Sequence, residues 1–304
     1  MEHLAVVIVN HNTSELLLEC LARLTNSRTT VPYTIYVVDN GSTDDSLARL
    51  AERFPEVVAI AAGRNLGFAG GNNLALRRAL ADVPPGAARA ARAVLLLNSD
   101  CFVEPETIAR LARFLDEHPE AGVVGPRLTL PDGRLDLACR RSFPTPASAF
   151  WKLTGLARLF PRSPRFARYN LTYLDPEQVA AVDSVVGACM LVRLGAIDAA
   201  GLLDEAFFMY GEDLDWAYRI KEQGWQVYYN PAARALHFKG ATSSKRSYRL
   251  IIAFYHAMYL FHRKHYAART FVLVNWLIAL GIVARGGFAL LLNLLRPRAA
   301  KRVA

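Results

Sequence analysis

The first 130 residues alternate short apolar runs with amphipathic stretches, and this pattern predicts strands that alternate with helices. The apolar runs have the length of strands and end in polar residues, as buried parallel strands do. The predicted strands are Leu4–Asn10, Tyr33–Val38, Val57–Ala61, Ala93–Leu97 and a run that begins at Val123. The predicted helices are Leu16–Leu24, capped by Thr13 or Ser14, and then Ser46–Arg53, Asn72–Leu80 and Glu106–Glu117.

Strands and helices at this spacing are typical of an α/β fold with a doubly wound, mostly parallel, Rossmann-like sheet. In such sheets, ligands bind beyond the carboxyl ends of the strands. Three of the predicted strands end in polar side chains, at Asn10, at Asp39 and at Asn98 to Asp100. The sequence therefore predicts a binding site at this edge of the sheet.

The second half of the chain is less regular. Residues 132–183 contain five prolines and many basic residues, and we expect this segment to cover a second substrate. Apolar character returns over 182–192, interrupted at Gly187, and a strand is predicted at Val227–Asn230.

Composition narrows the classes of ligand. The chain has 304 residues, 53% of them hydrophobic, and a formal net charge of +9. A packed core is expected, and the charge suits an anionic ligand or an anionic membrane. No RNP-type motif, zinc spacing or helix-turn-helix occurs, which disfavours nucleic acid as a partner. The four cysteines form no CxxC pair and fit a reducing cytosol.

Two apolar runs near the C-terminus, 271–284 and 288–295, are separated by Arg285, Gly286 and Gly287. Neither run alone reaches the roughly 20 residues that span a bilayer. Basic residues flank both ends, which indicates that both ends stay cytoplasmic. We expect a tail that lies on the membrane surface or enters it as a hairpin, and a buried core helix and a true span are the alternatives.

Two segments are candidates for nucleotide binding. Asp39, in the sequence VVDNGSTDDS, can accept the imide N–H of uracil or thymine, although such a turn also caps helices. The glycine-rich loop Gly63–Asn73 can bring backbone N–H groups close to phosphates or to a sugar. It forms neither GxGxxG nor a P-loop, so it does not indicate a dinucleotide or ATP site.

Acidic residues supply the candidates for catalysis and metal binding. Asp100 follows a buried strand and could hold a metal that bridges two phosphates. Glu212, Asp213 and Asp215 stand at the start of an amphipathic helix, where acid–base or metal work competes with simple helix-dipole stabilisation. His237 gains significance only if a metal lies nearby.

The ordered set of motifs resembles glycosyltransferase family 2, with the GT-A fold, and in particular its bacterial rhamnosyltransferases. The resemblance covers about residues 3–265. It rests on VVIVNHN, VVDNGSTDD, NLGFAGGNN, LLLNSD, GACMLVR, GLLDEAFFMYGEDLDWAYRI and HFKGATS. The chain departs from the family pattern at Asn98, which replaces the first acid of the DxD motif. It departs again at Ser184 and Val186, where Trp and Ser, respectively, are usual.

The resemblance implies a role for each matching residue. Asp213 would be the catalytic base, supported by Glu212, and Asp100 and His237 would bind Mg²⁺ or Mn²⁺. Asp215 and Trp216 are expected to contact the acceptor. The expected nucleotide-sugar contacts are Asn10, Asp39, Asn65, Gly67, Gly71, Asn98 and Asp100.

The resemblance further implies an inverting transferase that moves a sugar from a nucleotide-diphospho-sugar to a saccharide or polyprenyl-linked acceptor at the cytoplasmic face of the cell membrane. L-Rhamnose from dTDP-rhamnose is the first choice of donor, and UDP-sugars and GDP-mannose stay open. A non-catalytic sugar- or lipid-binding protein is the alternative of another class. A nucleotidyltransferase is disfavoured, because no Gly-rich, Arg-containing loop follows the first strand.

The expected organisation is a catalytic domain over 1–265 and a membrane-associating tail over 266–304. Within the domain, about 1–130 would bind the nucleotide and 131–265 the acceptor. Nothing in the sequence indicates an oligomeric state.

Overall fold

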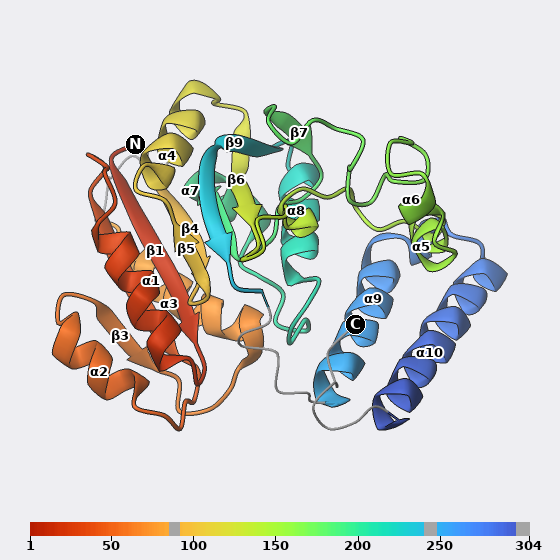
Figure 1. Cartoon of the computed structure of the whole chain (residues 1–304), viewed down its shortest axis with the longest axis horizontal. Coiled ribbons are helices and arrows are strands. Elements are labelled where there is room, and N and C mark those ends of the chain that lie inside the picture. The colour runs from red at the N-terminus through yellow and green to blue at the C-terminus, as the bar shows by residue number, and fades with distance from the viewer. Residues whose placement is uncertain (85–91, 240–247, 296–304) are drawn as a thin grey trace.

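The computed structural model describes residues 1–84, 92–239 and 248–295. Within these ranges the strands form one mixed sheet in the order β3-β2-β1-β4-β8-β6-β9-β5, and β7 also pairs with β9 (Figure 1). The strands are β1 (His3–Asn10), β2 (Tyr33–Asp39), β3 (Val58–Ala61), β4 (Arg92–Asn98), β5 (Cys101–Val103), β6 (Ala121–Thr129), β7 (Ala180–Val182), β8 (Cys189–Arg193) and β9 (Gln226–His237).

The helices connect these strands and then form a hairpin at the C-terminal end. The longer helices are α1 (Ser14–Thr25), α2 (Ser46–Arg53), α3 (Gly67–Ala81), α4 (Thr107–Glu117), α5 (Pro146–Leu153), α8 (Glu212–Glu222), α9 (Tyr248–His265) and α10 (Val272–Leu295). The shorter ones are α6 (Leu156–Leu159), α7 (Leu194–Ala200) and the 3-10 turns η2 (Leu137–Cys139) and η3 (Ala267–Arg269).

The N-terminal part of the sheet is parallel, as predicted. β1 pairs in parallel with both β2 and β4, and β2 pairs in parallel with β3. The register sets Asn10 beside Asp39 and Val9 beside Asn98, so the polar strand ends share one edge. Apolar residues at the centres of β1 and β4 are fully buried, as expected for strands covered on both faces.

The remaining strands make the sheet mixed. β8 runs antiparallel to both β4 and β6, while β6 and β9 are parallel. β5 and β7 both run antiparallel to β9. The predicted strand Val227–Asn230 is only the first third of β9, which continues to His237 through an irregular register after Pro126.

Two local predictions need correction. Thr13 precedes α1, but its hydroxyl donates to Asn10 Oδ1 (2.6 Å) and makes no cap hydrogen bond; instead, the Ser14 N–H donates to Asp44 Oδ2 (3.2 Å). The helix predicted from Asn72 begins earlier, at Gly67, which has a positive φ of 75° and lies against the Phe208 carbonyl. Only glycine fits there, because a Cβ would collide with that carbonyl.

The two C-terminal apolar runs form a single helix, which continues through Arg285–Gly287. α10 packs on α9 along one side, where Gly286 lies against the Tyr255 ring. Its other sides are exposed, with Trp276 at 72% and Val283 at 70%. The buried-core alternative is therefore wrong. In the part of the chain that the structure describes, α10 is the one helix long and apolar enough to cross a membrane, by length and composition.

The fold predicts that Gly71→Ala destabilises the protein. A Cβ at Gly71 would lie 2.8 Å from Val9 Cγ1 in β1, so the helix and strand would have to separate. We expect a loss of about 1–3 kcal/mol in the free energy of unfolding, measured by denaturant titration. Gly281→Ala is the control, because it also adds a methyl group to a helix but meets nothing within 4 Å. Equal stability of the two variants would contradict the packing argument.

Candidate active site

The pairing of β5 with β9 builds the first half of the site. Asp100 lies in the turn between β4 and β5, and Cys101 is the register partner of His237 at the end of β9. This pairing brings His237 Nε2 within 3.6 Å of Asp100 Oδ1, and both side chains are buried. Two residues that are 137 positions apart in the chain thus face one another at the predicted edge of the sheet.

Asp136 holds the other nitrogen of this histidine. His237 Nδ1 lies 2.9 Å from Asp136 Oδ2, and Lys239 Nζ donates to Asp136 Oδ1 at 2.8 Å. Burial alone would lower the pKa of His237, but the hydrogen bonds and charges of Asp100 and Asp136 raise it to about 9. Burial likewise opposes ionisation of Asp136, yet His237 and Lys239 hold its pKa well below its usual range.

This arrangement fits a divalent cation that is also held by phosphates. In the described residues, no group of three or more His, Cys, Asp or Glu side chains could enclose an ion alone. Mg²⁺ and Mn²⁺ need few protein ligands when a substrate supplies phosphate oxygens. Asp100 offers a carboxylate, and His237 would offer Nε2 when a bound cation displaces its proton, while Asp136 fixes the ring through Nδ1, the usual support for a metal-binding histidine.

The second half of the site is the start of α8. Asp213 is buried, and its Oδ2 accepts hydrogen bonds from Arg141 Nη2 (2.7 Å) and from the Gly187 N–H (3.1 Å). Arg141 is also buried, and it donates to the Val185 carbonyl (3.0 Å). Burial would lower the pKa of Arg141, but Asp213 and Tyr169 raise it, so the guanidinium stays charged.

Glu212 lies beside this pair with a different environment. Its side chain is buried, and its Oε2 has no hydrogen-bond partner among the described residues. Burial, followed by the negative charge of Asp213, raises the pKa of Glu212 well above its usual range. The two adjacent acids are therefore not equivalent: Asp213 is ion-paired, and Glu212 favours its neutral form.

A backbone connection joins the two halves. The Asn98 N–H, at the end of β4, donates to the Ala188 carbonyl (2.9 Å), and the neighbouring Gly187 N–H donates to Asp213. A Cβ at Gly187 would come within 3.1 Å of the Phe68 ring and 3.6 Å of Asp213 Cβ. The segment before β8 thus ties the acid pair to the strand that carries Asp100.

The residues expected to contact the nucleotide lie at the same edge of the sheet, but they differ in whether their side chains are already hydrogen-bonded within the protein. Asp39 is buried; its Oδ2 accepts the Ser42 N–H (3.1 Å), and its Oδ1 has no partner among the described residues. Both polar atoms of the Asn10 side chain are hydrogen-bonded: Oδ1 accepts from the Thr13 hydroxyl (2.6 Å), and Nδ2 donates to Ser42 Oγ (3.3 Å). Asn65 Oδ1 accepts the Gly67 N–H (2.8 Å) and so shapes the start of α3.

Asn40, next to Asp39, fastens this glycine-rich loop. Its Nδ2 donates to the Gly67 carbonyl (3.0 Å), and its Oδ1 accepts the Leu66 N–H (2.8 Å). Gly71 has a packing role against β1, as described above. Asp39 therefore keeps one carboxylate oxygen, Oδ1, that could accept a hydrogen bond from a pyrimidine base.

The structure does not favour the expected acceptor contacts of Asp215 and Trp216. Both side chains have 0% exposure, and Trp216 Nε1 donates to the Gly201 carbonyl (2.8 Å). Asp215 lies between Arg219 Nε (2.9 Å), Lys264 Nζ (2.8 Å) and His265 Nε2 (2.8 Å). These contacts hold α8 against the last turn of α9 and leave neither side chain exposed.

Sequence reasoning missed Asp136 and Arg141. Both lie in the irregular segment that follows β6, where no strand or helix pattern points to a site. The only available signal was that Asp136 is the last acid before a long basic stretch, in which Arg140 and Arg141 form a doublet. Of the HFKGATS motif, residues 240–243 lie outside the described residues.

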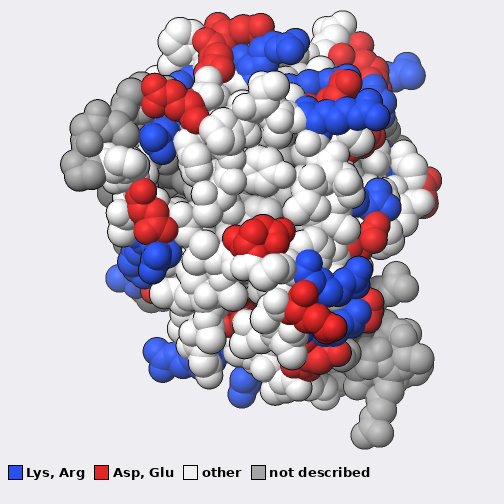
Figure 2. All heavy atoms as spheres, turned by 90° about the vertical axis from the view of Figure 1, so that its left-hand side faces the viewer, with Lys and Arg blue, Asp and Glu red and all other residues white. Residues whose placement is uncertain are grey.

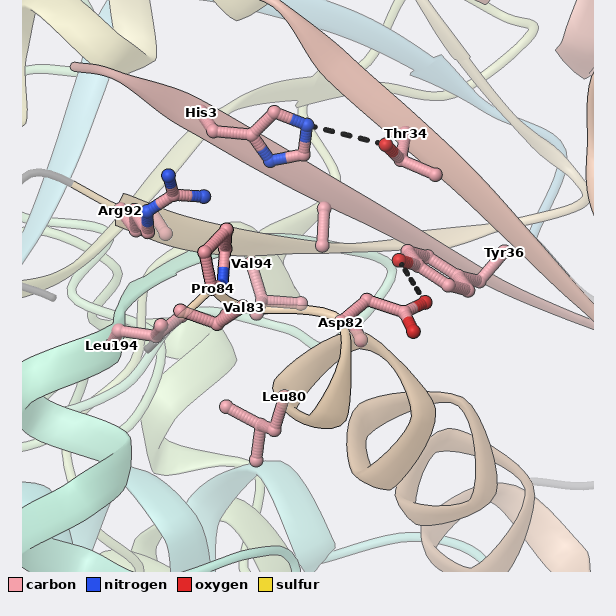
Figure 3. Close-up of a pocket in the computed structure, with 13 residues that line it drawn as sticks. His3, Thr34, Tyr36, Leu80, Asp82, Val83, Pro84, Arg92, Val94 and Leu194 are labelled. Atoms are coloured by element: carbon pink, nitrogen blue, oxygen red, sulfur yellow. Dashed lines mark hydrogen bonds between the residues drawn. The ribbon is translucent and has the colours of Figure 1, made fainter. Parts of the chain in front are cut away.

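A separate pocket opens at the opposite edge of the sheet. It lies at the amino ends of β1, β2 and β4, where His3, Thr34 and Arg92 surround it (Figure 3). Tyr36 donates to Asp82 at its rim (2.9 Å). Because ligands of parallel sheets bind at the carboxyl ends, this pocket is not the candidate site.

The family was tested by comparison with known proteins. The family model described as glycosyltransferase like family 2 matches residues 2–251. The chain belongs to this family. The geometry above therefore belongs to a glycosyltransferase, and the edge that carries Asp100 and Asp213 is its candidate active site.

Relatives of this glycosyltransferase transfer sugars. The N-acetylglucosaminyl-diphospho-decaprenol L-rhamnosyltransferase of Mycobacterium tuberculosis is 28% identical over 98% of this chain and 96% of its own length. The low-salt glycan biosynthesis hexosyltransferase Agl10 of Haloferax volcanii is 25% identical over 78% of this chain and 67% of its own.

Solved structures confirm the GT-A fold of the glycosyltransferase. TarS 1-349 of S. aureus has a TM-score of 0.55 and 16% identity, over 92% of this chain and 69% of its own. GalNAc-T7, crystallised with UDP, GalNAc and Mn²⁺, has a TM-score of 0.56 and 15% identity, over 78% of this chain. This chain spans 44% of the length of GalNAc-T7.

Replacing Asp215 tests its structural role in the glycosyltransferase. Asp215→Asn removes the buried counter-charge of the partly exposed Arg219 and Lys264 and of His265, and we expect a loss of about 1–3 kcal/mol in the free energy of unfolding. Glu222→Gln, an exposed acid of the same helix, should change stability by less than about 0.5 kcal/mol. Equal stability of both variants would refute the structural role.

The contribution of Asp215 to stability should depend on pH. Burial raises the pKa of Asp215, but His265, Lys264 and Arg219 outweigh it and lower the pKa from 3.8 to about 2. The stabilisation is complete above the ordinary pKa and is lost as pH falls through the folded-state value. The stability difference between wild type and Asp215→Asn should therefore shrink below about pH 4, measured by denaturant titration.

Proposed function

We propose that this protein is an inverting, metal-dependent rhamnosyltransferase that acts on a lipid-linked saccharide at a membrane surface. The observation that carries the proposal is the Asp213 carboxylate, fixed by Arg141 and Gly187 at the same sheet edge as Asp100 and His237. The length-wide similarity to the mycobacterial L-rhamnosyltransferase supports the sugar.

Asp213 acts as the general base. The acceptor oxygen attacks the anomeric carbon, the new C–O bond forms, and the bond from that carbon to the diphosphate oxygen breaks. The acceptor proton passes to the Asp213 carboxylate, and the nucleoside diphosphate leaves with the electron pair. One displacement from the opposite face inverts the configuration. Arg141 and the Gly187 N–H bind Oδ2 and hold the carboxylate in position.

Asp100 and His237 would hold Mg²⁺ or Mn²⁺. The ion would neutralise charge that develops on the departing diphosphate. Asp136 orients His237 through Nδ1, which leaves Nε2 directed at Asp100. The Mn²⁺ in the GalNAc-T7 crystal structure supports a divalent ion on this fold. Asn98 replaces the first acid of DxD, so fewer carboxylates share the ion than in the usual family pattern.

The free oxygen of Asp39 supports a pyrimidine nucleotide. A carboxylate can accept the imide N–H of thymine or uracil, so dTDP-rhamnose is the proposed donor and UDP-sugars remain second. GDP-mannose has no comparable support. A non-catalytic sugar- or lipid-binding protein would have no need for the fixed, ion-paired acid at Asp213.

The C-terminal hairpin supports a membrane location. α10 exposes apolar side chains on the sides that α9 leaves uncovered, and such a surface is suited to a bilayer. The decaprenyl diphosphate in the name of the mycobacterial relative supports a lipid-linked acceptor. We place the active site at the cytoplasmic face, where nucleotide-sugars are available.

Assays with several nucleotide-sugar donors test the proposed reaction and the role of Asp213 as its general base. Purified protein with Mg²⁺ or Mn²⁺ and a polyprenyl-diphospho-saccharide should release nucleoside diphosphate from dTDP-rhamnose faster than from UDP-sugars or GDP-mannose. Asp213→Asn should lower kcat by about 10²–10⁴-fold, because a positioned base contributes that much, while donor binding stays nearly unchanged.

Glu222→Gln should retain the wild-type rate. Turnover of Asp213→Asn within about threefold of wild type would reject Asp213 as the base. No release from any donor, with no thermal shift by any nucleotide, would reject the transferase reaction itself and favour the non-catalytic alternative.

The metal proposal has a test that does not depend on turnover. Asp136→Asn removes the carboxylate that orients His237, and such a change typically weakens metal binding about 10–100-fold. Mn²⁺ affinity in the presence of dTDP should fall by this factor in a calorimetric titration. Asp132→Asn, an exposed acid in the preceding turn, should leave the affinity unchanged. Identical Mn²⁺ affinities in both variants would show that His237 does not bind the ion.

A further inference from the structure

The segment between Asp136 and Asp175 has an unusual charge. Residues 137–174 contain seven Lys and Arg residues and no Asp or Glu. Four of the seven are exposed arginines that follow α5, namely Arg158, Arg162, Arg165 and Arg168. The opposite end of the molecule differs, because acidic and basic side chains are interspersed there (Figure 2). The excess of positive charge therefore belongs in part to one surface.

The same segment exposes large apolar side chains. Phe150 is 54% exposed, Leu153 59% and Leu159 69%, and Phe160 is also exposed. Trp151 packs edge-on against Phe150 and against Phe166, with ring centroids 5.1 and 5.0 Å apart. Apolar side chains displayed this openly on two short helices stabilise no core of their own. Such exposed apolar side chains indicate a surface that binds another apolar surface.

Arginine and aromatic rings are interleaved within this surface. The Arg165 guanidinium lies 5.4 Å from the centre of the Trp151 ring and 5.7 Å from that of Phe166. Side chains of this kind combine an apolar body with a polar or charged tip, and they concentrate at membrane interfaces. A purely apolar groove for a protein helix would not need this density of cations.

The surface lies at the same end of the molecule as the C-terminal hairpin. Figure 1 shows α5 and α6 at the end that also carries α9 and α10. Phe143, just before α5, packs against Phe261 of α9, with ring centroids 6.3 Å apart. Lys152 Nζ of α5 lies 4.8 Å from the centre of the Tyr169 ring, and the Tyr169 carbonyl accepts the N–H of Ser142, the neighbour of Arg141 (2.9 Å), which links α5 to the candidate active site. The C-terminal hairpin (α9 and α10), the cationic segment and the candidate active site are therefore neighbours.

We propose that residues 146–168 form a second membrane-binding surface, which docks on the anionic phospholipid headgroups of a bilayer beside the C-terminal hairpin. The arginines attract the headgroups, and Phe150, Leu153, Leu159 and Phe160 enter the interface. Two contacts fix the orientation of the protein on the bilayer, which one helix alone cannot do. The proposal rests on the membrane association proposed above but adds a surface that is separate from the tail.

Vesicle binding tests the proposal on the full chain. Wild type is mixed with vesicles of neutral phosphatidylcholine and of phosphatidylcholine with 30% phosphatidylglycerol, and the bound fraction is measured by flotation. Each cation near an anionic surface adds about 1 kcal/mol, so removing four weakens binding by one or more factors of ten. The variant with Arg158, Arg162, Arg165 and Arg168 replaced by Gln should bind the anionic vesicles at least about tenfold more weakly and the neutral vesicles unchanged.

A matched variant controls for total charge. Replacing the exposed residues Arg23, Arg28, Arg53 and Arg113 by Gln removes the same charge from α1, α2, α4 and the loop after α1, at the other end of the molecule (Figure 1). It should bind as wild type within about twofold, because exposed charges beyond a Debye length of about 8–10 Å are screened. Leu153→Ser with Leu159→Ser should weaken binding to both vesicle types, because less apolar surface enters the interface. Release of nucleoside diphosphate from the donor should be unchanged in all these variants.

The outcomes separate the two proposals. If the four-glutamine variant binds anionic vesicles as tightly as wild type, the second surface is rejected, although the tail can still anchor the protein. If wild type binds neither vesicle type, membrane association fails as a whole. If binding responds to a polyprenyl diphosphate but not to phosphatidylglycerol, the segment binds the acceptor and the proposal is overturned. Should the variant not fold, wild-type binding to anionic vesicles that does not weaken with rising salt would reject the proposal equally.

Discussion

The pairing of strands in the mixed sheet is the constraint on which the candidate site depends. Parallel pairing of β1 with β2 and β4 brings Asn10, Asp39 and Asn98 to one edge. Antiparallel pairing of β5 with β9 then returns the chain so that His237 faces Asp100. A change of register would separate these side chains, because one residue of slip turns each strand's side chains to the opposite face.

Buried charge is the second organising feature. Three buried carboxylates have a cation from a distant segment: Arg141 for Asp213, Lys239 for Asp136, and Lys264 for Asp215. An unpaired buried charge costs several kcal/mol, so these pairs fix loops that have little regular structure of their own. They also distinguish three acids that stand within four positions: Asp213 is the proposed base, Glu212 favours its neutral form, and Asp215 is a structural anchor.

The Asp215 contacts connect the proposed catalytic acids with the hairpin that we propose meets the membrane. Lys264 and His265 end α9, and α9 carries α10 on its other side. The helix that begins with Glu212 and Asp213 is therefore fastened to the hairpin. An orientation imposed on the hairpin by a bilayer, reinforced by the arginines of 146–168, would also orient the acid pair.

The sequence by itself determined the doubly wound fold, the family, and the approximate position of Asp39, Asp100 and Asp213, because apolar periodicity and residues at strand ends are local properties. It did not reveal the roles of Asp136 and Arg141, the structural role of Asp215, or the continuity of α10. Asp136 and Arg141 act through side chains more than 70 positions away, at His237 and Asp213. Asp215 differs from Asp213 in the partners that the tertiary fold brings to it, which are Lys264 and His265 for Asp215 and Arg141 and the Gly187 N–H for Asp213. Such roles follow from three-dimensional proximity, which no local pattern encodes.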